Sequence, residues 1–101
     1  ESESSEVIRN RVIAAREIQL KRYKNTGIHT NADLNSKNIK KYCKLNAESE
    51  NLLKSAAAGF NISGRGFDRI LKLARTIADL DEKDNIETAH VAQSLQYRNM
   101  M

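Results

Sequence analysis

An apolar stripe at helical spacing, set beside a face of arginines and lysines, runs through residues 63–80 and constrains the fold more than any other feature. Apolar side chains that recur at steps of three and four residues are typical of a half-buried helix. Ser63 stands just before the stripe, where its hydroxyl can accept a hydrogen bond from an N–H group of the first turn. The pattern predicts the central helix of the fold, from Ser63 to about Leu80, buried through Phe67, Ile70, Leu71, Ala74, Ile77 and Ala78.

Two arginines, Arg65 and Arg69, stand one turn apart at the start of this helix. The positive end of the helix dipole disfavours cations there. A residue that is unfavourable locally is often kept for something outside its segment, most simply an anion. The alternative is that both arginines are solvated surface residues. Residues 59–66 also match the glycine spacing of a phosphate loop, but Arg65 and Gly66 replace the required Lys and Ser or Thr, and no strand pattern precedes them, which excludes that motif.

The composition favours one small all-α domain, a bundle of four to five helices. The chain has 101 residues, no proline and four glycines, and it lacks the alternating apolar stretches that form strands. We predict a helix from Ser4 or Ser5 to about Lys24, a short one from Asn35 or Ser36 to Lys44, a third from Asn46 with a stop at Gly59, and a last one from Thr88 to about Arg98. Residues 28–35 are expected to be a polar connection.

The buried faces of the outer helices follow from the same period. The first helix is expected to bury Ile8, Val12, Ala15, Ile18 and Gln19; the short helix Ile39, Tyr42 and Cys43; the third Leu52, Leu53, Ala56, Ala57 and Phe60; and the last Val91, Ala92 and Leu95. Ile86 is expected to enter the core.

The acidic start of the chain, without an initiator methionine or a signal-peptide pattern, indicates a piece cut from a longer protein. We expect residues 1–6 to be a linker, 7–98 the helical domain and 99–101 a tail. No apolar run is long enough to span a membrane, so we expect no membrane partner. The single cysteine allows no internal disulfide and favours a reducing compartment, the cytoplasm.

The net charge of +4 is unevenly placed. Basic residues crowd the first two predicted helices, where they could contact the phosphates of nucleic acid or nucleotide, or simply be solvated; they are Arg9, Arg11, Arg16, Lys21, Arg22, Lys24, Lys37, Lys40, Lys41 and Lys44.

A second possibility for the function of the whole chain is a free-standing DNA-binding module. In that helix-turn-helix interpretation the groove-facing residues are Arg65, Arg69, Lys72 and Arg75.

Metal binding and cysteine catalysis have little support in the sequence. His29, His90 and Cys43 are isolated, with no spacing that suits metal ligands, so we expect no metal site. Cys43 shares its side of the short helix with Ile39 and is expected to pack rather than react. The acidic run Asp79–Asp84 lacks the pattern of a calcium loop and is expected to be a solvated turn.

Several stretches carry a family resemblance, in one order over nearly the whole chain. They are Ser63 to Ile70 with Ala74 to Leu80, Val12 to Arg16 with Gln19 and Arg22, Cys43 with Leu45 to Glu48, and His90 to Ala92 with Leu95 to Arg98. They resemble the C-terminal domain of magnesium-chelatase-like AAA+ ATPases, and within these the competence-protein (ComM) group. The connection Asn25–Asn35 is atypical of the family, so no role is carried over to it.

The resemblance implies an AAA+ lid, the small helical bundle that follows a nucleotide-binding core. ATP with Mg²⁺ would be bound mainly by that upstream core, and the lid itself would have no activity. The matching position for the sensor-2 arginine, which assists hydrolysis at the ATP phosphates, is Arg65, in its own or a neighbouring subunit; Arg69 is a weaker candidate for the same phosphates. The implied partners are the core in the same chain, further copies in a homo-hexamer, and DNA recombination intermediates. A magnesium chelatase subunit acting on a porphyrin is the alternative within the family.

Overall fold

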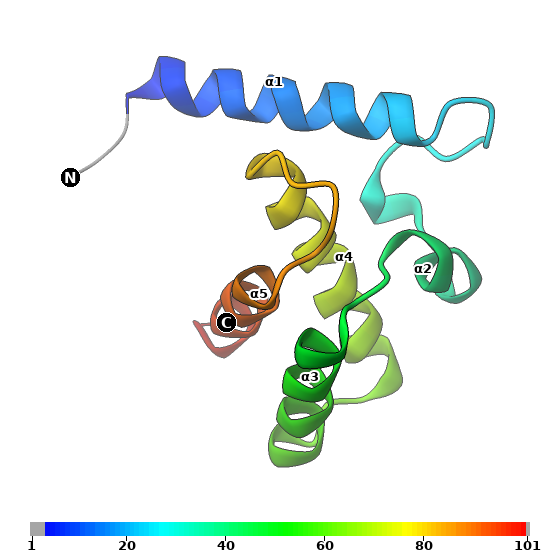
Figure 1. The fold of residues 1–101 in the computed structure, drawn as a ribbon, viewed down its shortest axis with the longest axis vertical. Helices are drawn as coiled ribbons and strands as arrows, with labels where there is room; N and C mark the ends of the chain where they lie inside the picture. The colour runs from blue at the N-terminus through cyan, green and yellow to red at the C-terminus, as the bar shows by residue number, and fades with distance from the viewer. Residues whose placement is uncertain (1–3, 101) are drawn as a thin grey trace.

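The computed structural model describes the backbone of residues 4–100 and the side chains of residues 4–97. Within that range the protein is all-helical, as expected (Figure 1). The elements are α1 (Ser5–Arg22), the short 3₁₀ helix η1 (Asn31–Asp33), α2 (Ser36–Tyr42), α3 (Ala47–Phe60), α4 (Gly64–Leu80) and α5 (Thr88–Met100). None of the described helices is both long and apolar enough to cross a bilayer.

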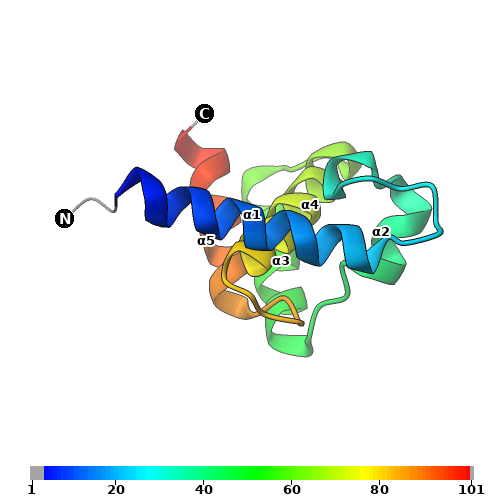
Figure 2. The ribbon, with the colours of Figure 1, turned by 90° about the horizontal axis from the view of Figure 1, so that it is seen from above.

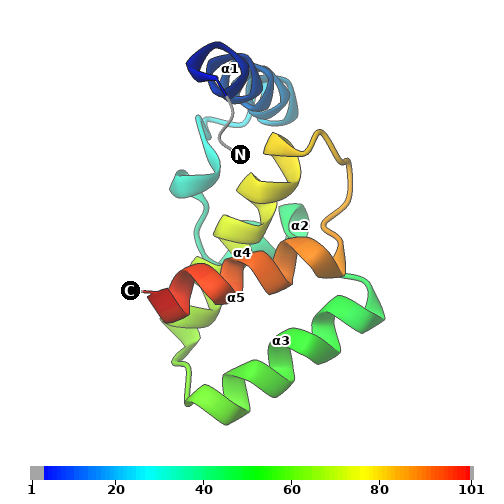
Figure 3. The same ribbon diagram turned by 90° about the vertical axis from the view of Figure 1, so that its left-hand side faces the viewer.

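Helix α4 is the centre of the bundle, which confirms the prediction from residues 63–80. It contacts α1, α2, α5 and η1, while α3 packs against α5 on the far side (Figures 1 and 3). The side chains of Ile70, Leu71, Ala74 and Ala78 are buried against a core drawn from α2, α3, α5 and the connections between helices; its further members include Leu34, Ile39, Leu53, Ile86 and Val91. Ile86 enters the core as predicted.

Side-chain caps begin the helices at the positions that the sequence indicates. Ser4 accepts a hydrogen bond from the Val7 N–H at 3.2 Å, and Asn35 accepts one from Asn38. The same contact recurs at Asn46, whose partner is the Ser49 N–H, and at Ser63. Each cap satisfies an N–H group that has no partner within its own helix.

The end of α3 differs from the prediction. Gly59 lies inside the helix, which continues to Phe60 and ends where Asn61 adopts a left-handed conformation at φ 54° and ψ 49°. Asn tolerates this conformation better than most side chains because its short polar group can hydrogen-bond locally. Phe60 is 56% exposed, so its expected burial is also wrong. The helical period places Phe60 on the inner face, but burial also needs a neighbour at that level of the helix.

Helix α1 buries only part of its predicted face. Ala15 and Gln19 are buried, whereas Ile8 and Val12 are 49% and 39% exposed. The N-terminal turns of α1 run past the rest of the bundle, so no other described helix covers them (Figures 1 and 2). Helix α1 takes in residues 5–6, which we assigned to a linker, and α5 continues to residue 100, into the expected tail. The division into linker, domain and tail remains a prediction.

The connection between α1 and α2 is not simply a polar loop, as the sequence suggested. Tyr23, Asn31 and Leu34 are each 2% exposed, and the first and last of these belong to the hydrophobic core. Gly27 has a φ of 83°, a left-handed conformation that glycine adopts readily. Asp33 accepts hydrogen bonds from the N–H groups of His29 and Thr30, which fixes the turn that leads into η1. The connection is therefore a structural part of the domain.

Candidate functional site at the start of helix α4

The first turn of α4 is built by Ser63 and Gly66. The Ser63 hydroxyl accepts a hydrogen bond from the Gly66 N–H at 3.1 Å. A Cβ atom on Gly66 would lie 2.9 Å from the Cγ2 methyl of Ile62, so the glycine makes room for Ile62 to pack beside the turn. At Gly64 a Cβ would meet nothing within 4 Å. The side of the turn at Gly64 is therefore open, whereas at Gly66 the Ile62 side chain already occupies the place that a larger residue would take.

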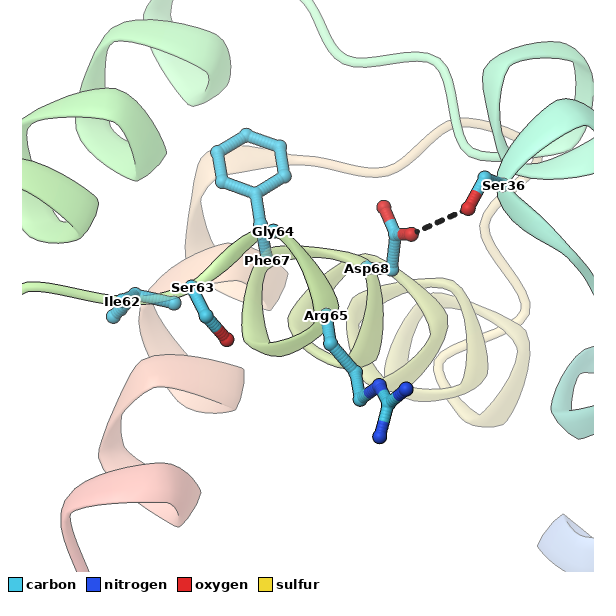
Figure 4. A pocket seen from close by; sticks show the side chains of 7 residues that line it. All are labelled: Ser36, Ile62, Ser63, Gly64, Arg65, Phe67 and Asp68. Atoms are coloured by element: carbon cyan, nitrogen blue, oxygen red, sulfur yellow. Dashed lines mark hydrogen bonds between the residues drawn. The ribbon is translucent and has the colours of Figure 1, made fainter.

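Arg65 projects outward from this turn. Figure 4 shows its side chain directed away from Phe67 and Asp68, which line the same hollow of about 510 Å³. Arg65 also lines two neighbouring hollows of about 390 Å³ each, one between α4 and α5 and one between α4 and α2. The residue is exposed, and among the described residues nothing forms an ion pair with it. A ligand could therefore approach its guanidinium without breaking an existing contact.

Arg69 lies one turn further along and lines both of the smaller hollows with Arg65. The structure thus brings the two predicted arginines to one surface. Asp68, the neighbour that could have neutralised Arg69, instead accepts a hydrogen bond from the Ser36 hydroxyl at 3.0 Å (Figure 4). Within the described part of the chain Arg69 forms no ion pair either.

The hollow between α2 and α4 is electrostatically suited to an anion. Arg65, Arg69 and Lys72 line it together with a single carboxylate, Asp68. The Nζ of Lys72 donates to the main-chain oxygen of Ala32 at 3.2 Å, which ties this side of α4 to η1. The unpaired N–H groups of the first helical turn add partial positive charge nearby. Phosphate oxygens fit such a surface better than a cation would.

A buried polar cluster around Asp79 was missed in the sequence analysis, which placed this residue in a solvated turn. The Asp79 carboxylate is fully buried and receives two hydrogen bonds from the Arg22 guanidinium, at 2.9 and 2.5 Å. Arg75 approaches it at 3.2 Å, and the Asn31 Nδ2 donates to it at 3.0 Å. The expectation for Asp79 was wrong because Arg22 and Asn31 come from segments distant in sequence. Arg75, four residues earlier in the same helix, is its one local partner in the cluster.

Asn31 holds the cluster to the connection before α2. Its side-chain oxygen accepts hydrogen bonds from Tyr23 and Arg22, and its N–H donates to the Gln19 side chain at 3.1 Å. Its Nδ2 group also donates to Thr76. The cluster therefore joins α1, η1 and α4.

The two arginines of the cluster respond differently to burial. Burial alone would lower the pKa of the Arg22 guanidinium, but its hydrogen bonds to Asp79 hold that pKa above the ordinary value. Burial lowers the pKa of Arg75, which the Asp79 carboxylate only partly offsets. Arg75 also donates to the main-chain oxygens of Lys83 and Asp84, at 2.9 and 3.0 Å, and so closes the turn after α4.

The helix-turn-helix interpretation fails at this cluster. Arg75, expected to face a DNA groove, is only 4% exposed. Helices α1, α2 and α5 all pack against α4, so the buried Arg75 is not available to a major groove, as a recognition-helix residue must be.

Cys43 and His90 are both buried. Burial raises the pKa of the Cys43 thiol to about 11, which suits packing and not nucleophilic catalysis. The Nδ1 of His90 accepts the Glu87 N–H at 2.9 Å, so the proton of the neutral ring is on Nε2, which donates to Asp81 at 2.9 Å. This hydrogen bond lowers the pKa of Asp81.

Possible metal ligands meet at one place among the described residues. Ligand atoms of Asp81, Glu87 and His90 lie within 4.8 Å of one another. A metal at Nε2 would have to displace the ring proton while Nδ1 still faces an N–H donor. This geometry gives a physical reason for our expectation of no metal site, which stays a prediction.

Comparison with known proteins places the chain in a family. The family described as "Magnesium chelatase, subunit ChlI C-terminal" matches residues 2–98. The chain is 41% identical over 96 residues to "Uncharacterized protein YifB" of Escherichia coli, covering 95% of this chain and 18% of the relative. It is 41% identical over 99 residues to "Competence protein ComM" of Haemophilus influenzae, covering 98% and 19%. A Mycobacterium tuberculosis protein is 30% identical over 98 residues, covering 97% and 20%.

The chain belongs to the magnesium chelatase ChlI C-terminal family, and its fold is that of the magnesium-chelatase-like lid domain. This confirms the resemblance drawn from the sequence. The chain spans about a fifth of the length of the curated relatives it matches.

Proposed function

We propose that this chain is the lid of a longer magnesium-chelatase-like AAA+ ATPase and that Arg65 is its sensor for bound ATP. The observation that carries the proposal is the exposed guanidinium of Arg65 at the first turn of α4, which lines three hollows and has no ion-pair partner among the described residues. A guanidinium beside the γ-phosphate stabilises the charge that develops in phosphoryl transfer. Arg69 is placed to support the same phosphates. A core outside this chain would bind the rest of the nucleotide and Mg²⁺.

For the complete protein we propose a cytoplasmic homo-hexameric motor that acts on DNA recombination intermediates. The support is the similarity to a relative named as a competence protein, together with the basic charge of the chain. The family description favours a second candidate, an ATPase subunit that serves magnesium insertion into a porphyrin. In either case the lid contributes nucleotide sensing and contacts between subunits.

The test is ATP turnover by the full-length protein that contains this chain. Arg65→Ala should lower kcat by about 100-fold, the usual loss when one donor to the developing charge is removed. Arg69→Ala should cost less, and Lys83→Ala, an exposed cation on the turn after α4, should leave turnover unchanged. Normal turnover by Arg65→Ala would show that the sensor assignment is wrong. Hexamers mixed from wild-type and Arg65→Ala subunits would distinguish action on the same subunit from action on a neighbour.

A further inference from the structure

Helix α2 presents one face made entirely of lysines. Lys37, Lys40 and Lys41 follow the helical spacing i, i+3, i+4, and Lys44 comes one residue after the cap of the helix. All four are exposed. Ile39, on the other side of α2, is 3% exposed and packs in the core. Because the apolar side of α2 is held against the bundle, Lys37, Lys40 and Lys41 are fixed toward solvent. The exposed Lys44 follows directly after the helix cap, and these four residues are called the lysine face.

The charge of the lysine face is not compensated. Residues 34–47 contain no Asp or Glu. No ion pair reaches any of these lysines from the described residues, although Lys41 lies over the Tyr42 ring, with its Nζ 5.3 Å from the centroid. On α3, by contrast, Lys54 pairs with Glu50 at 2.8 Å. Ordinary solvated faces mix the two signs of charge, so a face of one sign indicates a polyanionic partner.

We propose that the lysine face binds the phosphate backbone of nucleic acid without reading its sequence. A helix of seven residues is about 10 Å long, which matches about three phosphate intervals, and so about four phosphates, along one strand. The lysine face has only point charges, with no Arg, Asn or Gln on it for bidentate contacts to bases. Lysine is depleted in protein interfaces, which favours nucleic acid over an acidic protein. This binding does not depend on the role proposed for Arg65.

Salt dependence tests the proposal directly. The 101-residue chain is titrated onto a fluorescent DNA duplex, and binding is followed by anisotropy between about 20 and 200 mM KCl. If each lysine neutralises one phosphate, the slope of log Kobs against log salt should be about −3.6. Lys40→Gln with Lys41→Gln should bring the slope to about −1.8, because two contacts are lost. The matched control, Lys54→Gln with Lys83→Gln, removes the same charge from elsewhere and should keep the slope of the parent chain.

Three results would overturn the proposal. The first is no binding at the lowest salt concentration. The second is an equal loss in both double variants, which would mean that net charge acts without a defined surface. The third is binding of polyglutamate as tight as that of DNA and equally dependent on Lys40 and Lys41, which would assign the face to an acidic protein. The test leaves Arg65 intact, so its outcome is separate from that of the ATP turnover experiment.

Discussion

Replacing Asp79 by Asn tests whether the buried cluster holds the domain together. The two side chains have nearly the same shape, so the change removes a charge and leaves no cavity. In the native protein this carboxylate faces the guanidiniums of Arg22 and Arg75, whose side chains are 16% and 5% exposed. After the change both cations remain in the interior without a counter-charge, and an amide N–H₂ group faces at least one of them.

The expected loss is large for a domain of this size. Removing one partner of a buried ion pair costs about 3–5 kcal/mol, while a small domain is stable by only about 5–15 kcal/mol in total. At about 4 °C per kcal/mol, Tm should fall by roughly 12–20 °C. The charged side chain of Asp84 provides the matched control. It is exposed on the turn after α4, so Asp84→Asn should change the free energy of unfolding by less than about 0.5 kcal/mol.

Urea and thermal unfolding followed by circular dichroism measure both variants. If Asp79→Asn unfolds within about 0.5 kcal/mol of Asp84→Asn, the reasoning about the cluster is refuted. A double-mutant cycle with Arg22→Met adds a second criterion. Because Arg22 is the cation most closely bonded to Asp79, the double variant should be more stable than the sum of the single losses by about 1–3 kcal/mol.

Three further predictions follow from local geometry. Gly59→Ala should raise the free energy of unfolding by about 0.5–1 kcal/mol in urea titrations, because Gly59 lies inside α3 and an added Cβ meets nothing within 4 Å; a loss would contradict that placement. The Cys43 thiol should react with a disulfide reagent at pH 8 only after denaturant is added, because it is buried with a pKa of about 11; immediate labelling would contradict this. The folded-state pKa of Asp81 lies below its unfolded value because His90 donates to it, so this stabilisation is complete above about pH 3.9 and is lost as the pH falls from there through the lower folded-state pKa. Asp81→Asn should abolish this acid-dependent loss in the free energy of unfolding. An unchanged dependence of stability on pH would show that the hydrogen bond from His90 to Asp81 does not stabilise the fold.

The features that the sequence predicts correctly are local ones. Caps such as Ser63 and Asn46 act within three residues, and the stripe of α4 repeats within one helix. Both signals can be recognised without knowing what the segment touches. For this reason the helices, their order and the central position of α4 follow from the residues alone. The placement of Arg65 at the exposed first turn of α4 follows from the same cap.

The features that the sequence analysis missed depend on distant partners. Asp79 looks like the start of an acidic turn until Arg22, 57 residues away, is found bonded to it. Asn31 looks like a loop residue until its side chain meets Tyr23, Arg22, Thr76 and Asp79. The exposed state of Ile8 on α1 and Phe60 on α3 depends on where neighbouring helices end, which periodicity does not specify. An arginine one turn before an acidic residue in a helix, as in Arg75 and Asp79, was the one local hint of the cluster.

The two kinds of arginine site occupy opposite ends of α4, and this separation suits the sensing role proposed for Arg65. Asp79 is 14 residues beyond Arg65, about 21 Å along the helix axis, and there the cluster ties α4 to α1 and η1. At the N-terminal end, Ser63 and Gly66 define the turn that carries Arg65, whose guanidinium forms no ion pair with any described residue. A force applied to Arg65 by a phosphate would therefore act on a helix anchored at its far end, and would move the bundle as one body instead of bending a loop. Asp79→Asn in the full-length protein separates these roles, because it weakens the anchor while leaving every residue around Arg65 in place.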